Sequence, residues 1–184
     1  MPGKRISDAQ EILDFLRRLG QCYRHAGVVY LVGGSSLILV AAKESTFDID
    51  LKIEVAPEHH DEFIRCVRRL SAEMELSIEQ ASPDEFLPLP AGYEDRRRYV
   101  GRYAALDVFH FDFYSVALGK LQRGNEKDYN DVVSMIRAGV IELGNLEQYF
   151  REVLPKLEAY SLRTDPQDFE RKFALFKTRL SSDA

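Results

Sequence analysis

A strictly alternating segment constrains the fold more than any other part of the sequence. Residues 48–55 read DIDLKIEV, where apolar residues alternate with the charged residues Asp48, Asp50, Lys52 and Glu54. A period of two is typical of a β-strand, because successive side chains leave opposite faces of a sheet. The segment therefore predicts a strand with one polar face and one face packed on a core.

The flanking patterns predict an α/β (α+β) fold. Helical periodicity and caps favour helices over about residues 7–20, 35–43, 57–70, 115–124, 126–139, 145–155 and 165–180. Alternating or β-branched runs favour strands over about residues 28–32, 48–55, 73–79 and 98–114. We expect a small mixed β-sheet with flanking helices in residues 1–114, and a helical C-terminal part in residues 115–184 packed on it. Residues 82–98, rich in proline, are expected to be an irregular surface flap.

The composition excludes several classes of protein. A hydrophobic share of 45% is ordinary for a globular domain, and no apolar run reaches the roughly 20 residues that span a bilayer. A net charge of −5 argues against non-specific coating of nucleic acid. Cys22 and Cys66 form no close pair, so neither a disulfide framework nor a zinc knuckle is expected. The first ten residues lack a secretory apolar region, and we expect a cytoplasmic protein.

The two aspartates of the alternating strand are the first candidate site. On an extended strand, Asp48 and Asp50 leave the same face roughly 6–7 Å apart. Two such carboxylates repel each other unless a cation lies between them, and Mg²⁺ prefers oxygen ligands of this kind. The pair therefore predicts a metal site. A solvated strand face that simply carries acids, as Lys52 and Glu54 suggest, remains the alternative.

A glycine-rich turn precedes this strand. The sequence Gly33-Gly34-Ser35-Ser36 follows a predicted strand and opens a predicted helix. Backbone N–H groups at such a turn are able to hold a phosphate, and a serine hydroxyl adds a donor. If the turn holds a phosphate, the anion site and the cation site lie one short helix apart. An ordinary tight turn is the alternative.

The combined motif resembles that of a known superfamily. A hydrophobic strand, Gly-Gly-Ser, a short helix and Asp-x-Asp form the signature of polymerase-β-like nucleotidyltransferases, and residues 31–53, LVGGSSLILVAAKESTFDIDLKI, match it. The stretches LPLPAGYEDR and DFYSVALGKLQRGNEKDYNDV resemble a prokaryotic branch of that superfamily, which is related to AbiEii-type and MenT-type nucleotidyltransferase toxins. The resemblance covers about residues 28–137.

The resemblance implies further site residues. In such enzymes the two aspartates and a third acid hold two Mg²⁺ ions, which bridge a nucleoside triphosphate and the attacking hydroxyl. Asp112, near the end of a predicted strand, matches the third acid, with Asp107 as the alternative. The toxin-like branch also carries a functional lysine and a further acid, which match the residues Lys120, Asp128 and Asp131. Ion pairs across two helices explain these three equally well.

The function implied is Mg²⁺-dependent transfer of a nucleoside monophosphate from a nucleoside triphosphate to a hydroxyl. The acceptor would be an RNA, such as a tRNA end, or a protein, and a cognate antitoxin is a possible partner. Arg96, Arg97, Arg98 and Arg102, among tyrosines, could guide an RNA end or could form a solvated loop. Two alternatives stay open: a non-catalytic nucleotide-binding or antitoxin-like regulator of the same fold, and a metal-dependent sugar transferase, which the glycine turn does not support.

Overall fold

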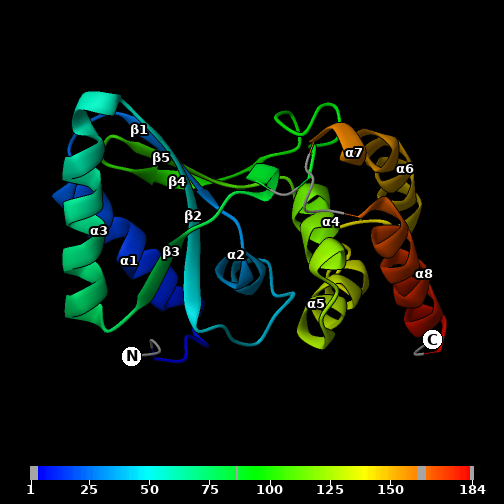
Figure 1. Cartoon of the computed structure of the whole chain (residues 1–184). Helices are drawn as coiled ribbons and strands as arrows, with labels where there is room; N and C mark the ends of the chain where they lie inside the picture. Colours follow the sequence, from blue (N-terminus) through cyan, green and yellow to red (C-terminus); the bar gives the residue numbers. More distant parts are fainter. Residues whose placement is uncertain (1–3, 86, 161–164, 183–184) are drawn as a thin grey trace. The chain divides into compact units, whose positions relative to one another are not determined.

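The computed structural model of the chain describes residues 4–85, 87–160 and 165–182 (Figure 1). The chain divides into two compact units. Unit 1 consists of Met1–Ser82 and Arg97–Phe111, and unit 2 of Pro83–Arg96 and Asp112–Ala184. The segment that links the two stretches of unit 1 therefore belongs to the unit that contains the C-terminal helices.

Unit 1 contains the five-stranded sheet. Its elements are α1 (Ala9–Cys22), β1 (Gly27–Leu31), α2 (Gly34–Leu39), β2 (Asp48–Val55), a 3₁₀ turn (Pro57–His59), α3 (His60–Met74), β3 (Ser77–Gln80), β4 (Arg98–Tyr103) and β5 (Leu106–His110). The strand order is β3-β2-β1-β5-β4. Strand β1 is antiparallel to β2 and parallel to β5, β2 is parallel to β3, and β4 is antiparallel to β5. The predicted mixed α/β fold is confirmed, and β2 has the bounds that its alternation indicates.

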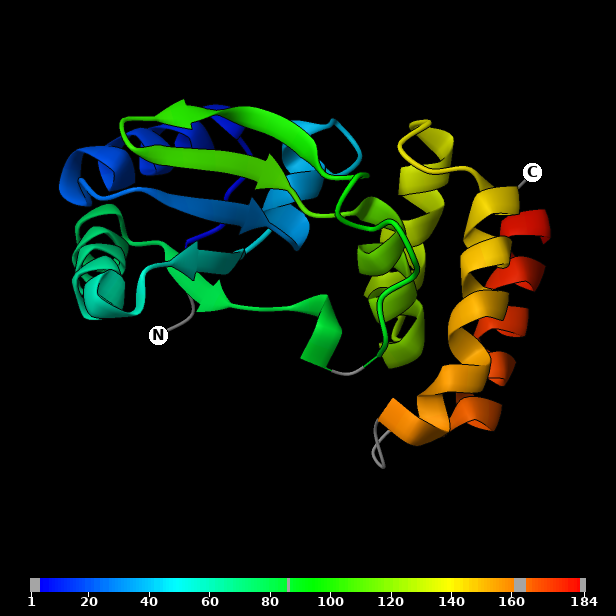
Figure 2. The same ribbon diagram turned by 90° about the horizontal axis from the view of Figure 1, so that it is seen from above.

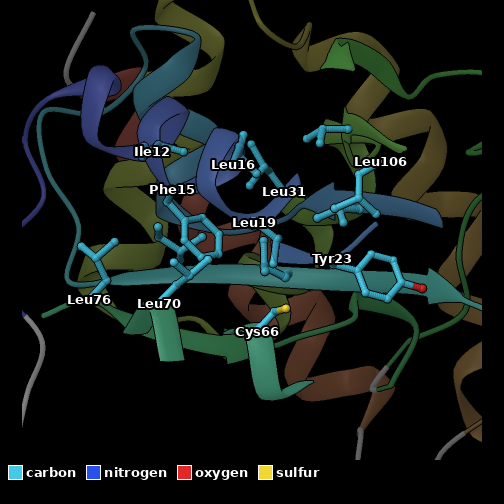
Figure 3. Packing of buried hydrophobic residues seen from close by; sticks show 14 of the residues in the cluster. Ile12, Phe15, Leu16, Leu19, Tyr23, Leu31, Cys66, Leu70, Leu76 and Leu106 are labelled. Atoms are coloured by element: carbon cyan, nitrogen blue, oxygen red, sulfur yellow. The ribbon is translucent and has the colours of Figure 1, made fainter. Parts of the chain in front are cut away.

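One face of this sheet is packed against α1 and α3 (Figure 3). The apolar positions of β2 point into this core, and Ile49 and Leu51 are 0% and 2% exposed. From the helices come the buried residues Ile12, Phe15, Leu16, Leu19, Phe63, Cys66 and Leu70. At about 1.5–3 kcal/mol per fully buried large apolar side chain, this cluster is the main stabilising term of unit 1. The polar positions of β2 consequently lie on the other face.

Two predicted strands differ from the structure. In place of one strand over residues 98–114, residues 98–110 form a hairpin, because Ala104 turns the chain with a φ of 56°, and a helix begins at Phe113. Strand β3 begins at Ser77, later than predicted, because Met74 still belongs to α3, whose C-cap Glu75 is left-handed with a φ of 56°. In both places the sequence fits an extended chain equally well, and tertiary packing decides where the chain turns.

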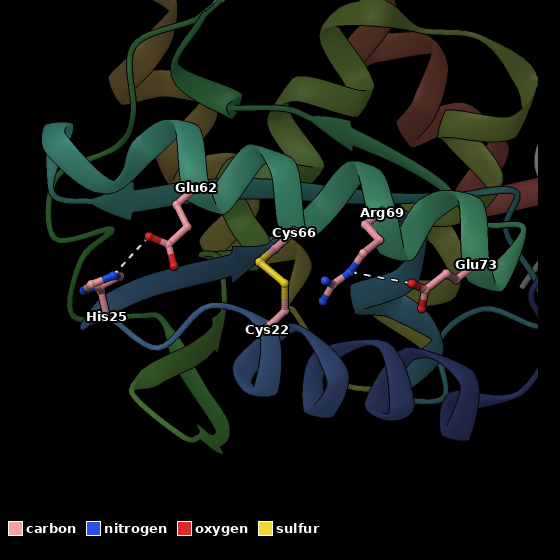
Figure 4. Close-up of a disulfide and its surroundings, with 6 residues drawn as sticks. All are labelled: Cys22, His25, Glu62, Cys66, Arg69 and Glu73. Atoms are coloured by element: carbon pink, nitrogen blue, oxygen red, sulfur yellow. Dashed lines mark hydrogen bonds and ion pairs between the residues drawn. A yellow bond between two sulfur atoms is a disulfide. The ribbon is translucent and has the colours of Figure 1, made fainter.

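A disulfide joins two helices of unit 1, which corrects the expectation from the cysteine spacing. Cys22 at the end of α1 is bonded to Cys66 of α3, with 5.8 Å between their Cα atoms (Figure 4). The two residues are 44 positions apart. The expectation was wrong because pairing depends on the packing of α1 beside α3, which sequence spacing does not reveal.

Unit 2 is helical. It contains a 3₁₀ turn (Pro83–Glu85), α4 (Phe113–Arg123), α5 (Glu126–Arg137), α6 (Leu143–Val153), a second 3₁₀ turn (Leu154–Lys156), α7 (Leu157–Tyr160) and α8 (Pro166–Ser182). Helices α6 and α8 lie side by side (Figure 2), and Phe150 stacks on Phe173 with ring centroids 3.9 Å apart. The segment expected to be a surface flap is largely irregular, but its Leu87 and Pro88 are buried.

In the described part of the chain, no helix has the length and apolar character needed to cross a membrane.

Candidate functional site

The polar face of the sheet in unit 1 carries both aspartates of the alternating strand. Tyr30 of β1 pairs with Lys52 of β2 on one side and with Phe109 of β5 on the other. These three side chains, and every second side chain from them along each strand, therefore lie on one face of the sheet. Asp48 and Asp50 lie on this face, and both are partly exposed. We call this surface the acidic face. It includes Asp48, Asp50, Glu54, Glu79, Asp107, Tyr30 and Phe109.

The glycine turn contacts the acidic face directly. A Cβ on Gly33 would lie 1.6 Å from Oδ2 of Asp50 and 2.6 Å from its Cγ, so the carboxylate fills the space that a side chain would need. The backbone N–H of Val32 donates to the carbonyl of Asp50 at 3.0 Å. A Cβ on Gly34 would lie 2.5 Å from Oγ1 of Thr46. The turn and the aspartates of the motif are therefore one packed structure.

The two serines of the turn are buried. The hydroxyl of Ser36 is 2.7 Å from Nδ1 of His110, whereas Ser35 is 0% exposed and its hydroxyl has no hydrogen-bond partner among the described residues. Burial, with a smaller effect of the Arg98 charge, lowers the pKa of His110 from 6.5 to about 4. His110 is therefore neutral at pH 7. Because both serines are buried, the side chains of Ser35 and Ser36 do not face solvent.

Asp112, the expected third acid, is the N-cap of α4. Its Oδ1 accepts from the backbone N–H of Tyr114 at 3.3 Å, and its Oδ2 accepts from the backbone N–H of Ser115 at 3.2 Å and from the Ser115 hydroxyl at 2.7 Å. Nε and Nη2 of Arg96 each donate to the same carboxylate at 3.0 Å. Asp112 is 1% exposed, so its oxygens are committed to contacts within unit 2.

Other acids of unit 1 share the acidic face. Asp107 pairs with Val28, and Val28 with Glu54, so Asp107 lies on the acidic face, where it forms an ion pair with Arg102 at 3.3 Å. Glu79 of β3 is in register with Asp50 and is exposed. Sequence reasoning missed Glu79, although an assumed parallel pairing of the two alternating strands would have placed it there.

Lys120, Asp128 and Asp131 come together in unit 2. Nζ of Lys120, a residue that is 6% exposed, lies 2.7 Å from Oδ2 of Asp131 and 3.4 Å from Oδ1 of Asp128. Arg123 donates to both oxygens of Asp128 at 2.8 and 3.1 Å. Burial opposes ionisation of Asp128, but Arg123 and Lys120 outweigh it and lower its pKa. The cluster joins α4 to α5 as a buried ion network.

The predicted arginine cluster is divided between the units. Arg97 of unit 1 donates to the hydroxyl of Tyr30 at 3.1 Å and lies over the ring of Phe109, 4.7 Å from its centroid. Arg96 of unit 2 lies over the ring of Tyr149, 4.2 Å from its centroid. Arg97 thus adds positive charge to the acidic face, whereas Arg96 is held inside unit 2.

Comparison with curated proteins and with solved structures found no match. A family model described as "Nucleotidyltransferase of unknown function (DUF6036)" matches residues 8–180, which is nearly the whole chain. The AbiEii-type and MenT-type branch is not resolved by this match. Because the match covers well over half of the sequence, the chain belongs to this family of nucleotidyltransferases of unknown function.

Proposed function

We propose that the protein transfers a nucleoside monophosphate from a nucleoside triphosphate to a hydroxyl acceptor, with Asp48 and Asp50 as ligands of Mg²⁺. The proposal is carried by the contact between the Asp50 carboxylate and Gly33, on the face that also bears Asp48. This contact fixes one carboxylate beside the turn that follows β1. A pair of acids with no role beyond solubility would not need such a fixed position.

The donor set of the acidic face fits a hard divalent ion. Two partly exposed carboxylates on one strand face offer oxygen ligands and leave coordination positions for phosphate oxygens. When bound, Mg²⁺ would neutralise the charge that gathers on the phosphates and on the entering and leaving oxygens. Asp48 and Asp50 hold the negative charge that attracts the ion, and Gly33 keeps Asp50 in place.

The remaining predicted site residues receive different roles in this proposal. The backbone of Gly33 and Gly34 stays the proposed phosphate contact, while the buried side chains of Ser35 and Ser36 support the turn from within. Lys120, Asp128 and Asp131 position α4 and α5 through their ion pairs. Asp112 orders Arg96 and the start of α4. Asp107, the alternative third acid, is in register with Val28 and Glu54, four residues along β2 from Asp50.

We propose an RNA as the acceptor. Tyr99 is 58% exposed on β4 and contacts the ring of Phe109, over which Arg97 lies. Exposed aromatic rings with an arginine are able to stack on unpaired bases and to contact the phosphate backbone. A tRNA end would satisfy this chemistry. The experiment below separates this RNA acceptor from a protein acceptor.

A regulator without transfer activity is a second candidate. The observation that favours it is the saturated hydrogen bonding of Asp112, which leaves this carboxylate no place in a metal site without rearrangement. Such a protein would bind Mg²⁺-nucleotide at the acidic face but release no pyrophosphate.

The test incubates the protein with Mg²⁺, total RNA and each of the four α-labelled nucleoside triphosphates. Asp50→Asn removes a proposed ligand, and Glu54→Gln, which lies on the same strand and face, is the matched control. Label on RNA that is lost in Asp50→Asn and kept in Glu54→Gln supports the proposal. Label on protein instead changes the acceptor. Nucleotide binding without label or pyrophosphate release supports the regulator, and equal activity of both variants overturns the assignment of Asp50.

A further inference from the structure

A second group of ligand-type side chains lies at the opposite end of β2 from the aspartates. One nitrogen each of His25 and His59 and one carboxylate oxygen of Glu62 all lie within 4.8 Å of one another, and all three residues are partly buried. Nε2 of His25 is 3.2 Å from Oε2 of Glu62. The rings of His25 and His59 are stacked, with centroids 3.6 Å apart and an interplanar angle of 11°.

The topology of unit 1 explains why these residues meet. Gly27 at the start of β1 pairs with Val55 at the end of β2, so the chain just before β1 lies beside the chain just after β2. His25 is in the first of these segments and His59 in the second. His59 ends the 3₁₀ turn and is the N-cap of α3, and Glu62 follows it by three positions in the first turn of that helix, so the two side chains lie close together.

The disulfide fastens the same two segments. Cys22 is three residues before His25, and Cys66 is one helical turn after Glu62 (Figure 4). The backbone that carries His25 is therefore covalently tied to the helix that carries Glu62. A site whose supporting segments are fixed in advance loses little entropy when it closes on a ligand.

We propose that His25, His59 and Glu62 bind one divalent transition-metal ion of the zinc class, at a site separate from the acidic face. Two imidazole nitrogens and a carboxylate oxygen are the donors of three-ligand zinc sites, in which a water completes the coordination. The ligands around such an ion lie roughly 3.3–3.5 Å from one another, given bonds of about 2.1 Å. The His25–Glu62 distance of 3.2 Å is close to this range, and all three donor atoms lie within 4.8 Å of one another, so small side-chain movements would bring them around one ion.

The surroundings of the cluster leave one side open. Tyr23 contacts the ring of His25, with centroids 5.5 Å apart. The side chains of His25 and Glu62 are 39% and 40% exposed, so an ion has access from solvent.

The imidazole donors separate this site from the proposed magnesium site. Mg²⁺ prefers oxygen ligands, whereas imidazole nitrogen suits Zn²⁺, Co²⁺ and Ni²⁺. Removal of the transition metal should therefore leave binding of Mg²⁺ at Asp48 and Asp50 unchanged. Binding at the cluster is also independent of whether the protein proves to be an active transferase.

The experiment titrates the full-length, untagged protein, with its disulfide intact, with ZnCl₂ in a calorimeter and with CoCl₂ in a spectrophotometer. His59→Gln and Glu62→Gln each remove one ligand. His60→Gln is the matched control, because His60 is next to His59 but is outside the cluster, 48% exposed, with Nδ1 4.0 Å from Asp61. Thermal unfolding followed by circular dichroism checks that each variant is folded, and the wild-type Co²⁺ spectrum provides a readout that needs no variant.

We expect one Zn²⁺ per chain, a Co²⁺ spectrum with intense visible bands, and at least a tenfold loss of affinity in His59→Gln and Glu62→Gln but none in His60→Gln. Asp50→Asn should bind Zn²⁺ as the parent does. The proposal is overturned if the wild type binds no Zn²⁺ at about 0.1 mM, if His60→Gln is as weak as His59→Gln, or if Asp50→Asn abolishes binding.

Discussion

The buried His110 should make the stability of unit 1 depend on pH between about pH 4 and pH 6.5. Its pKa falls from 6.5 to about 4 in the folded protein, because burial penalises the imidazolium and Arg98 repels it. Between these two values the unfolded chain binds a proton that the folded chain does not. Stability therefore rises with pH across this window and is fully present above about pH 6.5.

The magnitude follows from the same two values. A fall in pKa from 6.5 to about 4 corresponds to a difference of about 3 kcal/mol between neutral and strongly acidic conditions, of which about 2 kcal/mol is already lost at pH 5. This is a large part of the 5–15 kcal/mol that is usual for a domain. Carboxylates with lowered pKa values, such as Asp128, lose their contribution at lower pH.

The measurement is urea unfolding of wild type and of His110→Gln at about pH 7.5 and pH 5. Far-UV circular dichroism is the suitable signal, because the chain contains no tryptophan. Glutamine preserves a hydrogen-bond partner for Ser36 and cannot titrate. We expect the wild type to lose about 2 kcal/mol more than the variant between the two pH values. Parallel losses in both proteins would refute the reasoning, because His110 would then carry its proton in the folded state.

Three further perturbations test other parts of the structure. Gly33→Ala should abolish transfer and lower the melting temperature, because its Cβ would lie 1.6 Å from Asp50 Oδ2. The control Gly144→Ala in α6, which has open space at the Cβ, should be neutral or stabilising. A Gly33→Ala variant with unchanged activity and melting temperature would contradict the packing. Lys120→Met should cost about 3–5 kcal/mol in urea unfolding, because it removes the buried cation that contacts both Asp128 and Asp131. The exposed Lys127→Met should cost little, and equal effects of the two variants would argue against the ion network. Reduction of the Cys22–Cys66 disulfide, or its replacement by Cys22→Ser with Cys66→Ser, should lower the free energy of unfolding by up to about 4 kcal/mol, since the bond closes a loop of 44 residues. An unchanged urea midpoint would count against a stabilising role of the disulfide.

The sequence predicted those parts of the fold that depend on local periodicity. The bounds of β2, its two faces and the helices of unit 2 follow from side-chain spacing and caps. The family match agrees with the motif that links Gly33 to Asp50. Local patterns sufficed here because each of these features is fixed within a few residues along the chain.

Features that depend on strand register or helix packing could not be predicted in this way. Alternation within one strand separates Asp107 from His110, but only the pairing of β5 with β1 decides which of them shares a face with Asp50. The disulfide and the cluster at His25 and His59 join segments far apart in sequence in the same manner. The hydrogen bonds from Arg96 to Asp112 could not be predicted either, because they depend on how residues 83–96 place Arg96.

The position of β1 at the centre of the sheet also has a consequence for synthesis of the protein. Gly27 pairs with Val55 on one side, but its partner on the other side, Leu106, comes about 79 residues later in the chain. A chain still on the ribosome that has not yet released residues 106–110 would present β1 as an open edge, able to pair with other chains. We therefore expect folding of unit 1 to wait for β5, and a nascent chain paused before this strand to be the form most dependent on chaperones.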